Sequence, residues 1–340
     1  MCENEKRLSP RAVIWLLAAV LAAGIVGSVV LGRYPIGWAE FWGILGSKIL
    51  PVEPFWTPTQ EALLLNHRLP RIALACMVGG CLAGAGASYQ GVFRNPMAAP
   101  DILGASSGAA LGAALAICLN LGASGIMLFA FGASLLTVGA VIFTGSRIRG
   151  KRSLGLILAG IMVSSMVSSG TSFLKLVADP EDQLPAITYW MMGSLNGTGP
   201  EDLFFAAGPM AVGLGTLSLL RWRLNVLTLS DEESRTIGVD PGKLRNLVVV
   251  CATLVTAACV SVSGMIGWVG LVIPHLTRKL VGSDYRFLLP ASVLFGAVFL
   301  LMADNISRNL LPTEIPIGIL TSLIGAPLFI FLLTKEGTRI

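Results

Sequence analysis

Residues 12–31, AVIWLLAAVLAAGIVGSVVL, are twenty uncharged and mostly apolar residues in a row, and they decide the class of this protein. A helix of about 20 apolar residues crosses the hydrocarbon core of a bilayer, whereas the apolar core of a signal peptide is only about 7–15 residues long. Lys6, Arg7 and Arg11 precede the stretch, as basic residues often do on the cytoplasmic side. We therefore expect a retained first membrane helix.

The rest of the chain has the same character. Of its 340 residues 54% are hydrophobic and only 13% are charged, against about 25% charged in a soluble domain. The sequence predicts one all-α integral membrane domain over residues 1–340 with ten transmembrane helices. The charge-poor segments are 12–31, 69–93, 102–120, 124–146, 153–177, 202–220, 244–262, 264–281, 287–307 and 315–334.

The basic residues predict the orientation. With both termini in the cytoplasm, 18 of the 24 Lys and Arg residues fall on the inside and 6 on the outside, as the positive-inside rule requires. This places loops 32–67 and 178–200 outside. The net charge of +5 is then explained by basic loops beside anionic lipid, and no nucleic-acid partner is implied.

The two outside loops carry signals of their own. Trp38, Trp42 and Trp56 suit a segment lying at the membrane interface. The middle of 178–200 is apolar but too short to span, so we expect a short helix there. Arg68 and Arg71 lie outside against the charge bias, and either lipid headgroups or an acidic partner would explain them. For Arg308, a pair with Asp304 one helical turn earlier is the simpler explanation.

The longest inside loop contains a predicted short helix within the segment 224–242. Ser230 suits the N-cap, and Glu233 three residues later completes a capping box. Asp231 and Glu232 favour the same helix start, and Gly238 suits its end. The helix serves either as a solvated connector or as a docking surface for a cytoplasmic partner.

Chemistry-bearing motifs are scarce. Residues 145–151, GSRIRGK, match the spacing of a phosphate-binding loop but lack the Ser or Thr that binds magnesium. His67 and His275 are solitary, and the six cysteines form no C-x-x-C pair, so no metal site and no catalytic residue is expected. A membrane enzyme is thus disfavoured. An ion-driven secondary transporter would need ionisable residues deep within its spans, whereas Lys175 and Asp304 lie near the ends of theirs.

Two further patterns concern helix packing. Gly80, Gly84, Gly104, Gly108 and Gly112 have the small-x-x-x-small spacing of closely packed membrane helices. The segments 69–177 and 244–334 each hold four predicted spans and enter the membrane from opposite sides. That arrangement permits an inverted repeat.

Several stretches together resemble the permease subunits of bacterial ABC importers for iron–siderophore complexes, haem and vitamin B12 (FecCD-type). The similarity covers nearly the whole chain, and the order of the pieces makes it specific. The stretches are HRLPRIALA (67–75), GASYQGVFRNPMAAPDILGASSGA (86–109), YWMMGSL (189–195), LSDEESRTIGVD (229–240), GMIGWVGLVIPHLTRKLVGSDYRFLLP (264–290) and EIPIGILTSLIGAPLFIFLL (314–333).

The resemblance implies a type II ABC importer permease in the cytoplasmic (inner) membrane, a transport subunit without enzymatic activity or cofactor. It implies a second permease copy, with a homodimer favoured over a pair with a related permease. It also implies two cytoplasmic ATPase subunits, which bind ATP and Mg, and an extracytoplasmic solute-binding protein. The implied cargo is an iron chelate, with ferric siderophore the leading candidate and haem or vitamin B12 (a corrinoid) the alternatives.

Roles carry over to matching positions. Arg68, Arg71 and Arg308 match residues that meet acidic groups of the binding protein, a task that suits the planar guanidinium. The segment that couples to the ATPase would comprise Leu229, Ser230, Asp231, Glu232, Glu233, Arg235 and Gly238. The cytoplasmic gate and pathway would involve Asn95, Met97, Ser153 and Leu154.

Overall fold

The computed structural model describes residues 9–337 apart from 33, 52 and 149–151, and its described residues form helices and connections without a β-strand. The elements, in chain order, are α1 (Pro10–Val30), α2 (Trp38–Ser47), α3 (Pro58–Leu63), the π-helix η1 (Leu64–Arg68), α4 (Leu69–Phe93), the 3₁₀ helix η2 (Pro100–Leu103), α5 (Ala105–Cys118), α6 (Ala123–Arg147), α7 (Arg152–Val177), α8 (Gln183–Met192), α9 (Pro200–Leu219), α10 (Arg221–Leu227), α11 (Asp231–Thr236), α12 (Pro241–Ser263), α13 (Val269–Val281), α14 (Tyr285–Asn309) and α15 (Ile317–Gly337).

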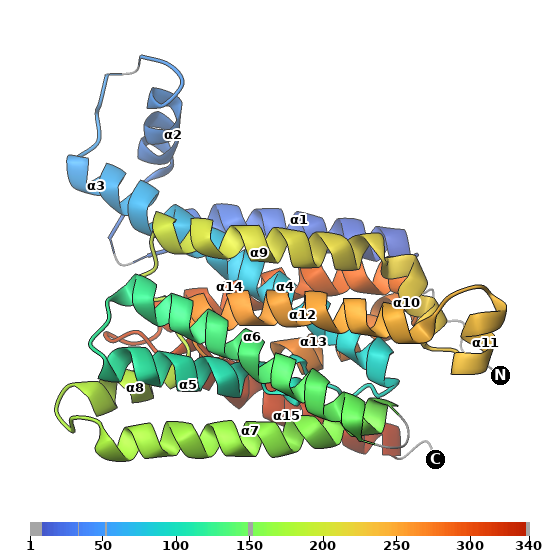
Figure 1. The fold of residues 1–340 in the computed structure, drawn as a ribbon. Helices are drawn as coiled ribbons and strands as arrows, with labels where there is room; N and C mark the ends of the chain where they lie inside the picture. Colours follow the sequence, from blue (N-terminus) through green and yellow to red (C-terminus); the bar gives the residue numbers. More distant parts are fainter. Residues whose placement is uncertain (1–8, 33, 52, 149–151, 338–340) are drawn as a thin grey trace.

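The long helices run side by side between two ends of one bundle (Figure 1). Helices α2, α3 and α8 lie at one end, and α10 and α11 lie at the other, where α1 begins and α15 ends. The end with α8 is called the outer end and the end with α11 the inner end, after the orientation predicted from charge. The largest cluster of buried apolar side chains among the described residues extends from Val13 of α1 to Ile317 of α15.

Seven helical segments in the described part of the chain are long and apolar enough to cross a membrane. Each of the ten predicted segments contains a helix, but α5 and α13 have only 14 and 13 residues. At about 1.5 Å per residue, such a helix covers roughly 20 Å of a hydrocarbon core about 30 Å thick. The helices in the predicted segments 102–120 and 264–281 are thus shorter than a full span, and the total of ten transmembrane helices stays a prediction.

Glycines bring α4 into direct backbone contact with its neighbours. A methyl group at Gly79 would lie 2.3 Å from the carbonyl oxygen of Gly296 in α14, and one at Gly86 would lie 1.8 Å from that of Gly270 in α13. The predicted packing role of Gly108 and Gly112 is confirmed, because each faces a carbonyl group of α6 at 2.8 Å or less. Close packing of this kind is the main attraction between helices in lipid.

The predicted outside loop 32–67 contains the short helices α2 and α3, and helix continues unbroken from Pro58 to Phe93. The sequence favoured a helix start near Pro70, since proline lacks an amide hydrogen and clashes with the carbonyl group four residues earlier. The π-helical turn at Leu64–Arg68 widens the backbone at that place. The helix thus passes the proline, and Arg68 lies inside it.

The two predicted halves correspond in structure. The first comprises a long helix (α4), a short helix (α5) and two long helices (α6 and α7), and the second repeats this order with α12, α13, α14 and α15. Each short helix begins inside the bundle, after a residue in the left-handed region: Gly104 at φ 76° and Trp268 at φ 70°. This order supports the inverted repeat that the sequence permits.

Three further predictions concern the helix within 178–200, residues 145–151 and metal binding. The short helix expected within 178–200 is confirmed as α8. Of residues 145–151, which match the spacing of a phosphate-binding loop, residues 149–151 lie outside the described part of the chain. No cluster of three metal-binding side chains occurs among the described residues.

Candidate functional site

At the inner end, the predicted short helix of segment 224–242 is confirmed as α11. The Ser230 hydroxyl accepts a hydrogen bond from the Glu233 amide at 3.2 Å, and the Glu233 carboxylate accepts one from the Ser230 amide at 2.8 Å. These bonds hold the pKa of Glu233 below its usual value. Gly238 follows the helix at φ 81°, a conformation that glycine adopts without strain. Leu229 and Ile237 are exposed beside α11.

Asp231 ties this short helix to two membrane helices. Its Oδ1 lies 2.8 Å from Arg94 Nη2 at the end of α4 and 3.1 Å from Arg245 Nη2 on α12. Arg94 also donates a hydrogen bond to the Leu227 carbonyl at 2.9 Å. Partial burial alone would raise the pKa of Asp231, but Arg245 and Arg94 outweigh that effect and lower it. The carboxylate is therefore ionised at neutral pH and joins three segments.

A cavity of about 420 Å³ opens beside this junction. It brings together residues for which the sequence predicts different roles: Ser153 and Leu154 of α7 as gate residues, and Asp231 as a coupling residue. Asn95 and Met97 follow Arg94 directly in the chain, and the Asn95 side chain accepts a hydrogen bond from the Met97 amide at 2.9 Å. Met97 and Leu154 are both exposed. The structure thus places the predicted gate residues next to the predicted coupling helix.

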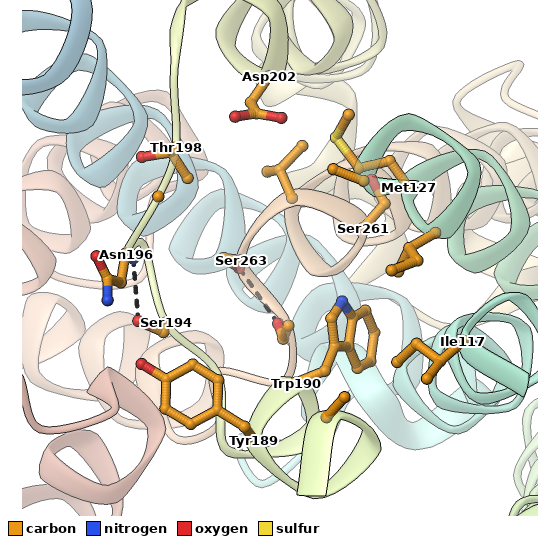
Figure 2. A pocket seen from close by; sticks show the side chains of 16 residues that line it. Ile117, Met127, Tyr189, Trp190, Ser194, Asn196, Thr198, Asp202, Ser261 and Ser263 are labelled. Carbon is orange, nitrogen blue, oxygen red and sulfur yellow. Dashed lines mark hydrogen bonds between the residues drawn. The ribbon is translucent and has the colours of Figure 1, made fainter. Parts of the chain in front are cut away.

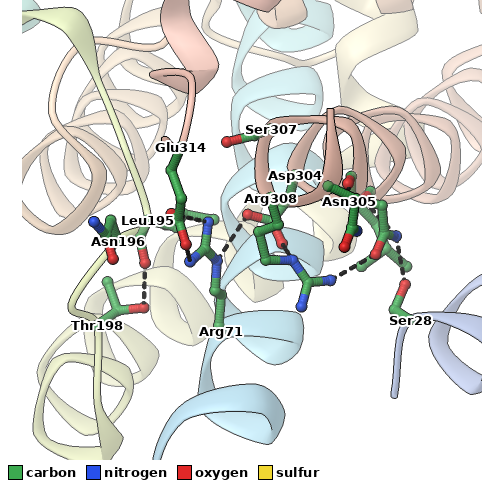
Figure 3. A network of polar contacts seen from close by, with 12 residues as sticks. Ser28, Arg71, Leu195, Asn196, Thr198, Asp304, Asn305, Ser307, Arg308 and Glu314 are labelled. Atoms are coloured by element: carbon green, nitrogen blue, oxygen red, sulfur yellow. Dashed lines mark hydrogen bonds and ion pairs between the residues drawn. The ribbon is translucent and has the colours of Figure 1, made fainter. Parts of the chain in front are cut away.

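At the outer end, Arg71 occupies the centre of a buried ionic network (Figure 3). Its Nε lies 2.9 Å from Asp304 Oδ1, and its two terminal nitrogens face the Glu314 carboxylate at 3.1 and 2.9 Å. Arg308 Nε lies 3.1 Å from the other Asp304 oxygen, which confirms the pair predicted from the sequence. Asn305 accepts from Arg308 and donates to Ser28 on α1. The network therefore joins α1, α4, α14 and the connection before α15.

Arg68 has neutral partners instead. It donates hydrogen bonds to the carbonyl groups of Val29, at 2.7 Å, and Tyr34. A cavity of about 410 Å³ at the outer end is lined by Arg68, Arg71 and Arg308 together with His67 and Glu314. The three arginines outnumber the two carboxylates of Asp304 and Glu314, so this region has an excess of positive charge.

The structure qualifies the predicted docking residues without testing their role. Arg68, Arg71 and Arg308 are only 6%, 8% and 8% exposed, so any contact with an external partner would have to be made through the cavity. The sequence did not identify Glu314 as a partner of these arginines, and it predicted only Arg308 as a partner of Asp304. Asp304 is fully buried. An acidic residue within an apolar span was the available signal, since such residues almost always have partners.

A second cavity at the outer end, of about 340 Å³, lies between α6, α8, α9 and the end of α12 (Figure 2). Its walls include Met127 and Trp190, and its polar groups include Tyr189 and Asp202. The Asp202 carboxylate already accepts a hydrogen bond from the Gly199 amide at 2.7 Å and caps α9. Residues 196–198 border both outer cavities and form the wall between them.

Comparisons with known proteins agree with this architecture. The molybdate import system permease protein MolB of Haemophilus influenzae is 39% identical over 327 residues, which is 95% of each chain. A protein of Helicobacter pylori named as a probable iron chelatin transport system permease is 42% identical over 273 residues, 80% of this chain and 82% of that one. A metal-chelate type ABC transporter solved in an inward-facing conformation superposes with a TM-score of 0.86 at 38% identity, covering 96% of this chain and 99% of the other.

The model of the FecCD transport family matches residues 20–335, and the arrangement of long and half-length helices described above is shared with the solved transporter. The predicted type II ABC permease fold is thereby confirmed. The chain belongs to the FecCD transport family and is a multi-pass membrane permease of the ABC importer class.

Proposed function

We propose that this permease carries an iron chelate from an external binding protein across the cytoplasmic membrane, driven by ATP hydrolysis on two partner ATPase subunits. The observation that carries the proposal is the Asp231–Arg94 ion pair at the inner end. Through it, α11 is tied to the residue that immediately precedes Asn95, so a displacement of α11 by the ATPase would be passed to the predicted gate. ATP is bound by the partner, and this chain is a transport subunit.

The assembly in this proposal contains a second copy of the chain, with both termini in the cytoplasm. At the outer end, the cavity lined by arginines would receive a carboxylate of the binding protein. An arginine suits this role because its planar fork pairs with carboxylates in two parallel hydrogen bonds.

A ferric siderophore is the proposed cargo, with haem or a corrinoid as alternatives. The support is the relative named for iron chelatin transport and the similarity to a metal-chelate type transporter. The relative named for molybdate import keeps a simple oxyanion under consideration.

Reconstitution tests the proposal as a whole. The permease should co-purify with the ATPase encoded beside it, and liposomes holding both should import a ferric siderophore only with ATP and the binding protein. An ATPase variant unable to hydrolyse ATP serves as the control and should abolish uptake. Uptake that persists with this variant and follows an ion gradient would instead identify a secondary transporter.

Docking at the outer cavity is tested with Arg68→Gln, because among the described residues Arg68 donates to carbonyl groups and its loss leaves the ionic network intact. Loss of one charged hydrogen bond, worth about 1.5–3 kcal/mol, should weaken binding of the solute-binding protein at least tenfold. Loss of the bonds to Val29 and Tyr34 should also lower the melting temperature of the permease, so binding is measured at a temperature at which the variant is folded. Unchanged affinity in a folded variant would show that Arg68 serves the fold or the lipid instead.

A further inference from the structure

Asp101 lies in an unusual place for a charged residue. The sequence assigns it to the inside loop before the span at 102–120, but the chain after Met97 turns back into the bundle. Asp101 belongs to the short 3₁₀ helix η2, and α5 begins four residues later, inside the protein. Pro100, the residue before Asp101, packs against Gly270 of α13, so Asp101 lies alongside the helices of the bundle.

Contacts place this carboxylate near the middle of the bundle's length. Asp101 lines a cavity of about 100 Å³ together with Leu82, which is close to the midpoint of α4. A methyl group at Gly104, just after η2, would contact Ser164 at the midpoint of α7. Asp101 thus lies at about half the thickness of the membrane that these helices span.

Few groups offset the negative charge of this carboxylate. Ser106 donates its amide hydrogen to Asp101 Oδ1 at 2.9 Å, and the salt bridges found among the described residues include none to Asp101. Asp101 is nevertheless exposed on the surface of the single chain. An ionised carboxylate facing hydrocarbon costs several kcal/mol, so acidic residues at this depth face a water-filled cavity or a protein partner.

The neighbours of Asp101 identify the face to which it is exposed. On one side, η2 packs against α7, where a methyl group at Gly160 would lie 2.3 Å from the Ile102 carbonyl oxygen. On the other side of the cavity, Trp268 contacts Phe329 of α15, with ring centroids 6.2 Å apart. The carboxylate therefore lies between the segments packed on α7 and on α15, and α7 is also the helix that carries Ser153 and Leu154.

We propose that Asp101 faces the water-filled transport pathway at mid-membrane and selects for cargo with cationic or hydrogen-bond-donor groups, such as ammonium, amide or hydroxyl groups on a metal chelate. The same charge disfavours a free oxyanion. This inference rests on the proposed transport function and narrows its substrate class. Asp101 acts as a specificity-determining residue through its charge and position, with the indole of Trp268 forming part of the adjacent wall.

The electrostatic effect of Asp101 on the cavity can be measured without knowing the cargo. Ser106→Cys, in a background lacking the native cysteines, places a thiol in the same cavity. The assembled transporter is treated with a cationic and an anionic methanethiosulfonate of similar size, both without nucleotide and with trapped ATP. The cationic reagent should react about tenfold faster in at least one state, because a nearby negative charge attracts it and repels the other. Adding Asp101→Asn should bring the two rates within about twofold.

Two controls make the result decisive. Glu181→Cys, in the connection between α7 and α8, measures the reactivity of the two reagents far from Asp101. Its ratio of cationic to anionic rates should not change when Asp101→Asn is added. Melting temperatures show whether each variant is folded, and Asp101→Glu should retain the cation preference. A thiol at 106 that reacts with neither reagent in either state, or a preference that survives Asp101→Asn, would overturn the inference. Failure of ATP-driven uptake in the unmodified transporter would instead refute the proposed function.

Discussion

At the scale of single residues, the outer arginines differ from what their sequence context suggests. Arg71 forms ion pairs with Asp304 and Glu314, and Arg308 shares Asp304. A buried ion cluster is weak evidence for stability, but removing one member leaves the others buried without compensation. The arginines are therefore part of the fold, whatever partner the cavity receives.

Replacing Asp304 by Asn tests this structural role. Two buried guanidinium groups would lose a shared carboxylate, and we expect the free energy of unfolding to fall by about 3 kcal/mol. Thermal unfolding in detergent measures the change. Glu314→Gln is the matched control, since its side chain is 23% exposed and water can replace it. Equal stability of Asp304→Asn and the unmodified permease would contradict the importance of the pair.

A second prediction at this scale concerns the inner end. Asp231→Asn removes the charge that faces Arg94 and Arg245 and should reduce transport per ATP hydrolysed several-fold while the ATPase remains bound. Uptake and phosphate release measured in the same liposomes give the ratio. Glu232→Gln, beside it on α11, leaves the Asp231 pairs intact and should have the smaller effect. The proposed coupling route fails if the ratio is unchanged in Asp231→Asn.

At the scale of helices, α4 is the central element, because α13 and α14 approach its backbone at glycines. The half-length of α5 and α13 has a structural consequence of its own. Each begins inside the bundle, so irregular backbone is found at membrane depth. Such backbone is tolerated in a membrane protein only where protein or a water-filled cavity surrounds it.

Gly86→Ala tests the contact between α4 and α13. The added methyl group would lie 1.8 Å from the Gly270 carbonyl oxygen, so α13 must move. We expect a clearly lower melting temperature and reduced recovery of the assembled transporter. Gly215→Ala on α9 is the matched control, because nothing lies within 4 Å of the added group. A melting temperature as high as that of the control would mean that the two backbones are not in close contact.

At the scale of the whole molecule, the bundle has one end with α8 and the arginine cavity and one end with α10, α11 and the predicted gate residues (Figure 1). This separation suits a transport subunit that meets different partners on the two sides of a membrane. The orientation itself is predicted from the distribution of basic residues.

Single cysteines test the orientation in intact cells. In a background lacking the native cysteines, Glu181→Cys should react with a membrane-impermeant maleimide added from outside. Glu232→Cys should react only after the cells are permeabilised. The reverse pattern would place the termini outside and would exclude α11 as the contact with a cytoplasmic ATPase.

The sequence by itself determined the membrane class, most helices, the α11 capping box and the Asp304–Arg308 pair. These depend on hydrophobicity and on contacts between residues within a few positions, which a linear pattern records. Only the tertiary structure decided that Arg71 pairs with Asp304 and Glu314, that α5 and α13 are half-length, and that Asp101 lies at mid-depth. Arg71 and Glu314 are 243 positions apart, and only the packing of α4 against α14 brings such residues within a few ångströms.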